Sequence, residues 1–138
     1  MISINDIQYR TDRAIDVAAF EDILQRSGLA ARRPAGDRER LGRMLRAYNL
    51  IITAWRAEEL VGIATLWTDY AFSAYLADLA VVQDLQKRGI GRRLVEIARA
   101  TVGPEVTLLL LSAPQAAGYY PKIGMERFAD CFLFRRSR

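Results

Sequence analysis

The sequence contains no histidine and only one cysteine, Cys131. Without histidine, Ser-His-Asp and Cys-His catalysis and the zinc and iron sites that use imidazole are excluded, and one cysteine cannot supply a site made of thiolates alone. Proton transfer must then fall to a carboxylate, a tyrosine, a lysine, water or the backbone. A single cysteine also excludes an internal disulfide, which is typical of proteins in a reducing compartment. We therefore expect a cytoplasmic protein without a metal ion.

Long apolar runs and lysines are also scarce. No apolar run approaches the roughly 20 residues that a membrane-spanning helix needs, and the first residues lack the profile of a signal peptide. Lys87 and Lys122 are the only lysines among 20 basic residues, and the net charge is +4. Four basic residues crowd one short segment: Lys87, Arg88, Arg92 and Arg93. This crowding favours a polyanionic ligand. We expect neither a membrane nor nucleic acid as a partner, since no aromatic-interleaved basic strand, helix-turn-helix or zinc-finger spacing is present.

The length of 138 residues suits a single domain over 1–138. Apolar periodicity and turn residues predict alternating strands and helices. The predicted strands are 2–10, 50–55, 60–68, 75–82, 106–111 and 125–136, the last with a turn or bulge at 129–130. The predicted helices begin near Thr11 or Asp12, at Asp37, at the glycine loop around residue 90 and near Ser112, and the first and last end at Gly28 and Gly124.

The order of these elements predicts an α/β fold with a mixed, mostly antiparallel sheet. The hairpins before residue 75 should be antiparallel, whereas the strand–helix–strand unit from Tyr75 to Leu111 should be parallel and right-handed. The strand at 106–111 is almost continuously apolar, which is typical of a strand covered on both faces.

A glycine-punctuated basic loop stands between an apolar strand and an amphipathic helix at residues 79–94. The first N–H groups of a helix lack intrahelical partners and the helix dipole favours an anion there. Gly89 and Gly91 remove side chains that would keep a phosphate away. The nucleoside-triphosphate loop G-x-x-x-x-G-K-[ST] does not occur in the sequence. The dinucleotide loop G-x-G-x-x-G is also missing, because Leu94 stands at its third glycine position. By itself, the loop is either a diphosphate cradle or a glycine-softened turn.

Two motifs together favour the cradle. Residues 86–91 read Q-x-x-G-x-G, which resembles the [QR]-x-x-G-x-[GA] pyrophosphate loop of the GNAT superfamily of coenzyme A-dependent N-acyltransferases. Residues 117–125 resemble the A-x-x-F-Y-x-K-x-G-F segment of that family, and the order of elements also matches. The resemblance implies the acyl-CoA N-acyltransferase fold and an N-acetyltransferase. Its co-substrate would be acetyl-CoA, and its acceptor a primary amine of a small molecule or peptide that attacks directly in a ternary complex.

The resemblance also implies which residues bind the cofactor. The backbone of Leu79 and Val81 would pair with the pantetheine arm like an added strand, and the Val81 N–H would lie near the thioester carbonyl. The remaining cofactor-binding residues would be those of the loop, with backbone N–H groups from 87 to 92 around the pyrophosphate: Gln86, Lys87, Arg88, Gly89, Ile90, Gly91 and Arg92.

Tyr120 is the expected catalytic residue, because it aligns with the family tyrosine near the coenzyme A sulfur. A phenol with a pKa near 10 is protonated at neutral pH and can give a proton to a departing thiolate. Neighbouring helical residues point about 100° apart, so Tyr119 is assigned to packing. The base is left open between water and four carboxylates: Glu58, Glu59, Asp69 and Asp78.

Other features allow more than one interpretation. The aromatic residues Trp67, Tyr70, Phe72 and Tyr75 line an acceptor pocket or belong to the core. The loop from Arg32 to Arg40 gates the acceptor or is a surface connection. An acyl-CoA-binding regulatory module without turnover is the alternative function, and a basic nucleic-acid-binding protein is a third. A C-terminal edge strand permits a homodimer.

Overall fold

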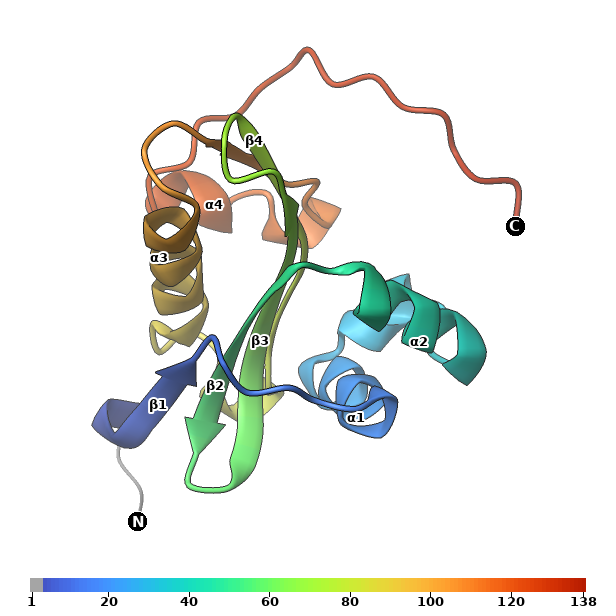
Figure 1. The fold of residues 1–138 in the computed structure, drawn as a ribbon, viewed down its shortest axis with the longest axis vertical. Helices are drawn as coiled ribbons and strands as arrows, with labels where there is room; N and C mark the ends of the chain where they lie inside the picture. The colour runs from blue at the N-terminus through green and yellow to red at the C-terminus, as the bar shows by residue number, and fades with distance from the viewer. Residues whose placement is uncertain (1–3) are drawn as a thin grey trace.

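Five strands form one sheet whose spatial order, β1-β2-β3-β4-β5, follows the chain. The computed structural model describes residues 4–138. The first four strands are antiparallel neighbours, and β5 runs parallel to β4 (Figure 1). This arrangement confirms the mixed, mostly antiparallel sheet. The strands are β1 Ile7–Arg10, β2 Leu50–Arg56, β3 Glu59–Thr68, β4 Ser73–Val81 and β5 Thr107–Leu109.

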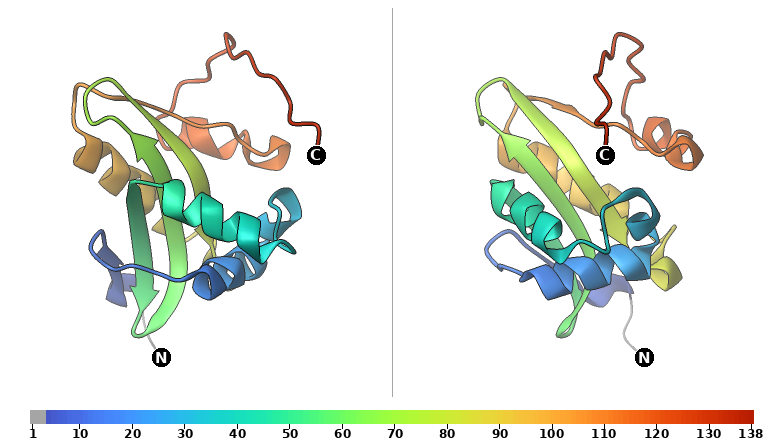
Figure 2. Two further views of the ribbon diagram at one scale, coloured as in Figure 1. Left: turned by 45° about the vertical axis from the view of Figure 1, so that its right-hand side comes forward. Right: turned by 90° about the vertical axis from the view of Figure 1, so that its right-hand side faces the viewer.

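Helices cover both faces of the sheet (Figures 1 and 2). The helix α3 (Ile90–Val102) packs on β2, β3 and β4 from one side, while α1 (Val17–Ser27) packs on β3 and β4 from the other and carries α2 (Arg38–Ala47). Consequently β3 is almost entirely buried. The short elements are η1 Ile4–Asp6, η2 Leu29–Arg32, η3 Gln83–Leu85, η4 Pro114–Ala116 and α4 Tyr119–Lys122.

Helix boundaries follow from capping residues. The Asp16 carboxylate caps the start of α1, because it accepts the backbone N–H of Ala19 at 2.8 Å. Gly28 ends the same helix with a φ of 88°. The predicted start of α1 near Thr11 or Asp12 is therefore wrong, because Asp12 instead pairs with a neighbouring arginine. Asp37 caps α2 through the same kind of contact at 3.0 Å, as predicted.

Three predicted strands differ in extent. The first is shorter than 2–10, since η1 precedes β1 and positions 2–3 lie outside the described residues. The strand predicted at 106–111 reduces to three half-exposed residues, so it is not covered on both faces. The strand predicted over 125–136 is wrong: the chain after Gly124 is an exposed, irregular segment that leads away from the sheet (Figure 1). A strand needs a partner edge, and β5 is too short to supply one over that length.

The segment before Gly124 also differs from a single helix. A 3₁₀ turn at 114–116 and the four-residue α4 replace the helix predicted from Ser112 onward. Pro121 removes one backbone donor from this stretch, which limits regular helix formation. The two tyrosines of α4 are nevertheless held in a defined turn, which the N–H of Gly124 closes on the Pro121 carbonyl at 3.1 Å.

Two irregularities of β4 shape the site. Thr65 pairs with Asp78 and Leu66 with Leu76, so Ala77 is an extra residue, a β-bulge. The pairing of β4 with β5 ends at Tyr75, after which the two strands diverge. The C-terminal half of β4, beyond Tyr75, therefore presents an open edge.

We expect the contact between α3 and the sheet to be sensitive to volume at Gly62. A Cβ there would lie 3.2 Å from Ile90 Cγ2 and 3.3 Å from both Ala54 Cβ and Leu94 Cδ1. Gly62→Val should therefore lower the free energy of unfolding by about 1–3 kcal/mol, measured by urea denaturation. Gly36→Val is the control, because nothing lies within 4 Å of a Cβ at that position. Equal stabilities for the two variants would contradict the packing of α3 on Gly62.

Candidate active site

The glycine loop is tied to the rest of the fold by Gln86. Its Nε2 donates to the Val81 carbonyl at 2.8 Å and to the Ser27 carbonyl at 3.1 Å, which links the end of β4, the end of α1 and the loop. Lys87 has a positive φ of 65°, and Gly89, with φ of 92°, precedes the first turn of α3. The loop thus turns sharply to present the N-terminal end of α3.

Space and charge are both available at this end of α3. No atom lies within 4 Å of a Cβ built on Gly89, whereas a Cβ on Gly91 would approach the Tyr119 hydroxyl to 3.1 Å. Lys87, Arg88 and Arg92 are exposed around it. The Glu96 carboxylate pairs with both Arg92, at 3.3 Å, and Arg93, at 3.5 Å. One carboxylate does not balance these basic residues, so the surface has a net positive charge.

The side chain of Ile90 does not belong to this surface. It is 1% exposed and packs against the Gly62 position in the core. Ile90 can therefore contribute only its backbone to a ligand. The same holds for Val81, which is buried.

The backbone of Leu79 and Val81 faces the open edge of β4. The Val82 N–H donates to the Val61 carbonyl at 2.9 Å, so the alternate residues of β4, Ala80 and Asp78, also bond to β3. Leu79 and Val81 are opposite Ala64 and Gly62 in non-hydrogen-bonded pairs, which turns their N–H and C=O groups away from β3. Because β5 has diverged, an extended ligand with amide groups could pair there.

Tyr120 and Tyr119 point to different places. Tyr120 lines a cleft of about 110 Å³ between β4, β5 and η2, together with Leu79 and Arg33. Burial raises the pKa of the Tyr120 phenol above its ordinary value, so it stays protonated at neutral pH. The ring of Tyr119 is perpendicular to that of Tyr120, and its hydroxyl lies over Gly91 at the start of α3. The Tyr119 hydroxyl thus borders the predicted cradle.

A buried carboxylate lies at the centre of the α1–α2 face. Asp78 is 1% exposed, and its Oδ2 accepts hydrogen bonds from the Tyr48 and Thr65 hydroxyls, each at 2.7 Å. Its Oδ1 accepts from Arg33 Nε at 2.6 Å, while Arg33 Nη2 donates to the Ala77 carbonyl at 2.8 Å. Both carboxylate oxygens are therefore occupied, and Arg33 holds the bulged residue of β4.

Sequence reasoning missed Arg33 and Tyr48 as parts of the site. Arg33 lies 45 residues from Asp78 along the chain, and Tyr48 lies 30 residues from it. No local pattern marks such a contact. The ion pair anchors Arg33 to the sheet, so the start of the 32–40 loop is fixed rather than a loose surface connection.

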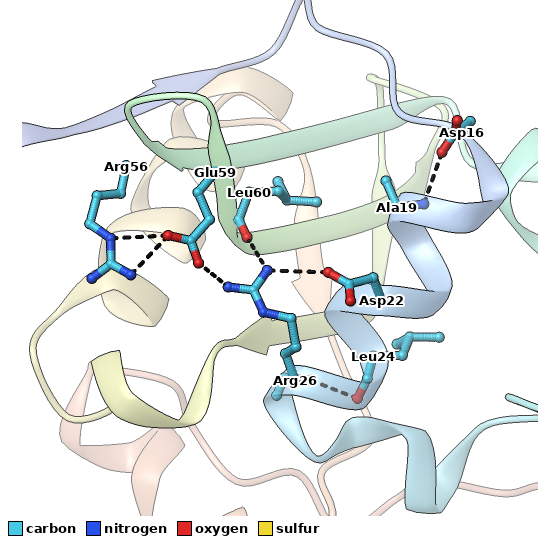
Figure 3. A network of polar contacts seen from close by, with 9 residues as sticks. Asp16, Ala19, Asp22, Leu24, Arg26, Arg56, Glu59 and Leu60 are labelled. Carbon is cyan, nitrogen blue, oxygen red and sulfur yellow. Dashed lines mark hydrogen bonds and ion pairs between the residues drawn. The ribbon is translucent and has the colours of Figure 1, made fainter.

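Glu58 and Glu59 are not at the site. They lie at the turn between β2 and β3, the end of the sheet opposite to Trp67 and Tyr75. Figure 3 shows the Glu59 carboxylate between the guanidinium groups of Arg56 and Arg26. Glu58 pairs with an arginine at 3.1 Å. Both carboxylates are therefore engaged in surface ion pairs away from the cleft.

Asp69 lies beside a second, larger cavity of about 390 Å³. This cavity adjoins the Tyr120 cleft. Tyr75 and Leu109 line the cavity, and the residues that follow them in the chain, Leu76 and Leu110, line the cleft. Trp67 and Tyr75 form its aromatic wall. Of the predicted acceptor-pocket aromatics, these two line the cavity, while Tyr70 and Phe72 are exposed in the adjoining turn.

Residues 4–138 contain neither a metal-binding cluster nor a membrane-spanning helix. No group of three or more histidine, cysteine, aspartate or glutamate side chains is placed to hold a metal ion within this range. Nor does any helix in it combine the length and apolarity required to cross a bilayer.

We expect Tyr48 to make stability depend on alkaline pH. Burial, together with the charge of Asp78, raises the pKa of Tyr48 well above its ordinary value. Above pH 10 the unfolded chain releases a proton that the folded protein keeps, so this phenol's contribution to stability is lost as pH rises, by up to about 1.4 kcal/mol per pH unit.

Tyr48→Phe should be less stable than the wild type by about 1.5–3 kcal/mol at pH 8, because it lacks the hydrogen bond to Asp78. That difference should shrink between pH 10 and 11 in urea denaturation, since phenylalanine does not ionise. A difference that stays constant over this range would contradict the buried contact.

Comparisons with known proteins agree with this geometry. Residues 47–127 match the acetyltransferase (GNAT) domain family. No curated protein matches the sequence significantly. The matched range contains β2 to α4, and therefore the open edge of β4, the glycine loop and Tyr120.

Solved structures of acetyltransferases share the fold. A GNAT family acetyltransferase from Streptococcus pneumoniae is 21% identical, with a TM-score of 0.69 over 94% of this chain and 99% of that one. An aminoglycoside acetyltransferase from an uncultured soil sample is 20% identical, with a TM-score of 0.70 over 97% of this chain and 99% of that one. Glucosamine-6-phosphate N-acetyltransferase from Arabidopsis thaliana is 11% identical, with a TM-score of 0.67 over 96% of this chain and 99% of that one. The family match covers more than half of the chain, and the fold agrees with it: this protein belongs to the GNAT family of acetyltransferases.

Proposed function

We propose that this protein transfers an acetyl group from acetyl-CoA to a primary amine. The observation that carries the proposal is the edge of β4 that is turned away from β3. The N–H groups of Leu79 and Val81 on the open edge of β4 lead to the glycine loop, and Tyr120 lines the cleft beside them. A pantetheine arm needs such an edge, a pyrophosphate needs such a helix end, and a thiolate needs a nearby acid.

The residues present fit the cofactor. A pyrophosphate would be held by N–H groups from Lys87 to Arg92, where the absence of a side chain on Gly89 leaves room, while the Tyr119 hydroxyl lies beside Gly91. The exposed side chains of Lys87, Arg88 and Arg92 add positive charge. Gln86 acts indirectly, because its amide is bonded to the carbonyls of Val81 and Ser27 and so fixes the loop relative to β4.

Tyr120 is proposed as the general acid. In the reaction a bond forms between the amine nitrogen and the acetyl carbon, and the thioester C–S bond breaks. The phenol of Tyr120 would give its proton to the departing thiolate, and its raised pKa keeps that proton available at neutral pH. The Val81 N–H would stabilise the oxyanion.

Water is proposed as the route by which the attacking amine loses its proton. Asp78 does not suit this role, since both of its oxygens already accept hydrogen bonds from Arg33, Tyr48 and Thr65. Its contacts make it a positioning group for the bulge of β4. Attack would be direct, because Cys131 is exposed on the segment after Gly124 and belongs to neither motif. We assign the protein to the cytoplasm, where acetyl-CoA and a reduced thiol are both expected.

A thiol-release assay tests the function. The full chain is incubated with acetyl-CoA and a library of primary amines, and free coenzyme A is measured. Release that depends on an amine supports the transferase. Coenzyme A binding in calorimetry without release by any amine would instead support a regulatory module of the same fold.

Tyr120→Phe should lower kcat by about 100-fold or more, because a general acid contributes typically 10² to 10⁴. The Kd of coenzyme A in calorimetry should stay within about twofold, since the proton is needed only in the transition state. Tyr9→Phe is the matched control: burial raises the pKa of this tyrosine too, but it lies on β1. An unchanged kcat for Tyr120→Phe would remove Tyr120 from the acid role.

We also propose that two copies of the chain associate through the segment 125–138. This segment exposes Phe128, Phe132, Leu133 and Phe134, of which Phe132 is 92% exposed. The outer edge of β5 is also open, with Leu109 46% exposed. An apolar segment and an unpaired strand edge on one molecule are complementary surfaces for a second copy, because exchange would cover both.

The dimer is tested by the mass in solution. Light scattering should give about twice the mass of one chain for the wild type and the mass of one chain for Phe132→Asp combined with Phe134→Asp. A wild-type monomer at 100 µM, a concentration on the order of ten times the Kd that a modest interface gives, would contradict this proposal.

A further inference from the structure

The larger cavity beside the Tyr120 cleft has a distinctive charge. It is lined by nine residues, and Asp69 is the only one of them that is ionised at neutral pH. The others are polar, apolar or aromatic, and include the half-exposed Trp67 and Tyr75. The Tyr120 cleft differs in that its charged residues, Arg32 and Arg33, are basic. Arg33 is paired with the buried Asp78, so of these two basic groups Arg32 is the one exposed at the cleft.

The charge of Asp69 is held in place by the backbone. Its Oδ1 accepts the N–H groups of Ala71, Phe72 and Ser73 at 2.8, 2.8 and 3.1 Å. These hydrogen bonds lower the pKa of the Asp69 carboxyl group below its ordinary value, so the group is ionised at neutral pH. Its second oxygen, Oδ2, accepts none of the hydrogen bonds found among residues 4–138.

The aromatic wall is rigid. The Trp67 ring lies between Tyr48 and Tyr75, with ring centroids 5.5 Å away on each side, and stacks on Tyr75 at an interplanar angle of 20°. Tyr48 is fixed in turn by its hydrogen bond to Asp78. Trp67 remains 44% exposed, so part of its surface is open to a ligand in the cavity. The Asp69 carboxylate favours a cation, and the stacked rings form a fixed apolar wall beside it.

We propose that this cavity binds a positively charged amine of the acceptor other than the amine that is acetylated. The proposal rests on the proposed function and makes the acceptor a diamine or polyamine. An amine held by Asp69 stays protonated, since a neighbouring carboxylate favours the charged form. It is therefore not the nucleophile. The reacting amine lies further along β4, in the Tyr120 cleft, and the bound ammonium group orients it.

A matched series of acceptors tests this proposal in the thiol-release assay. The probes are 1,4-diaminobutane, butylamine and 4-aminobutanoate, which differ only in the group at the far end of the chain. The kcat/KM value should be highest for the diamine, about five- to thirtyfold lower for butylamine and lower still for the amino acid, whose carboxylate Asp69 repels. Equal values for the diamine and butylamine would overturn the proposal.

Asp69→Asn isolates the charge. Asparagine keeps the acceptor oxygen for the three N–H groups of the turn and removes only the negative charge. The variant should lose the preference for the diamine, so that its ratio of kcat/KM for the diamine to kcat/KM for butylamine falls to about one. Asp16→Asn is the matched control, because it makes the same change at another carboxylate that accepts a backbone N–H, at the start of α1, where asparagine caps equally well. A preference retained in Asp69→Asn would overturn the proposal.

A binding measurement keeps this inference separate from the proposed function. If no amine releases thiol, the acetyl-transfer proposal fails, and calorimetry of 1,4-diaminobutane with the wild type and with Asp69→Asn still decides the charge selectivity. Binding to the wild type that falls at least fivefold in Asp69→Asn supports the ammonium site. Absence of binding, or equal binding to both proteins, overturns it.

Discussion

The buried ion pair between Asp78 and Arg33 is the interaction on which the site depends. A charged group taken out of water must be paired and hydrogen-bonded, and Asp78 has three donors on three different elements. Arg33 comes from the end of η2, Tyr48 from the end of α2 and Thr65 from β3. One carboxylate thus ties the ends of η2 and α2 to the central strands, at the residue next to the bulge of β4.

The bulge and the divergence of β5 act together on the chemistry. Without the bulge, Tyr75 and Asp78 would lie on opposite faces of β4, since side chains alternate along a strand. With it, both face α2: Tyr75 stacks on Trp67, and Asp78 bonds Tyr48, which also contacts Trp67. The divergence opens the edge at Leu79 and Val81 in the same stretch. The cavity beside Asp69 and the cleft beside Tyr120 are therefore placed next to one another along one pair of strands.

Local features of the site could be predicted from the sequence because they depend on neighbouring residues. Gly89 and Gly91 shape the turn before α3 by their lack of side chains, and the spacing Q-x-x-G-x-G is contained in six residues. The strand pattern likewise predicted the antiparallel hairpins and the parallel β4–β5 pair. The strand over 125–136 failed for the opposite reason: apolar residues make a strand only where an edge receives them, and the open edge of β5 is three residues long.

By itself, the sequence determined the family, the order of elements and the position of the glycine loop, because short motifs and hydrophobic periodicity are local properties. The tertiary structure alone decided which carboxylates belong to the site. Glu58 and Glu59 are removed to the far end of the sheet, Asp78 is saturated by hydrogen bonds, and Asp69 is left facing a cavity. These outcomes depend on a one-residue bulge and on contacts across 30 to 45 positions of the chain, and no local pattern encodes either.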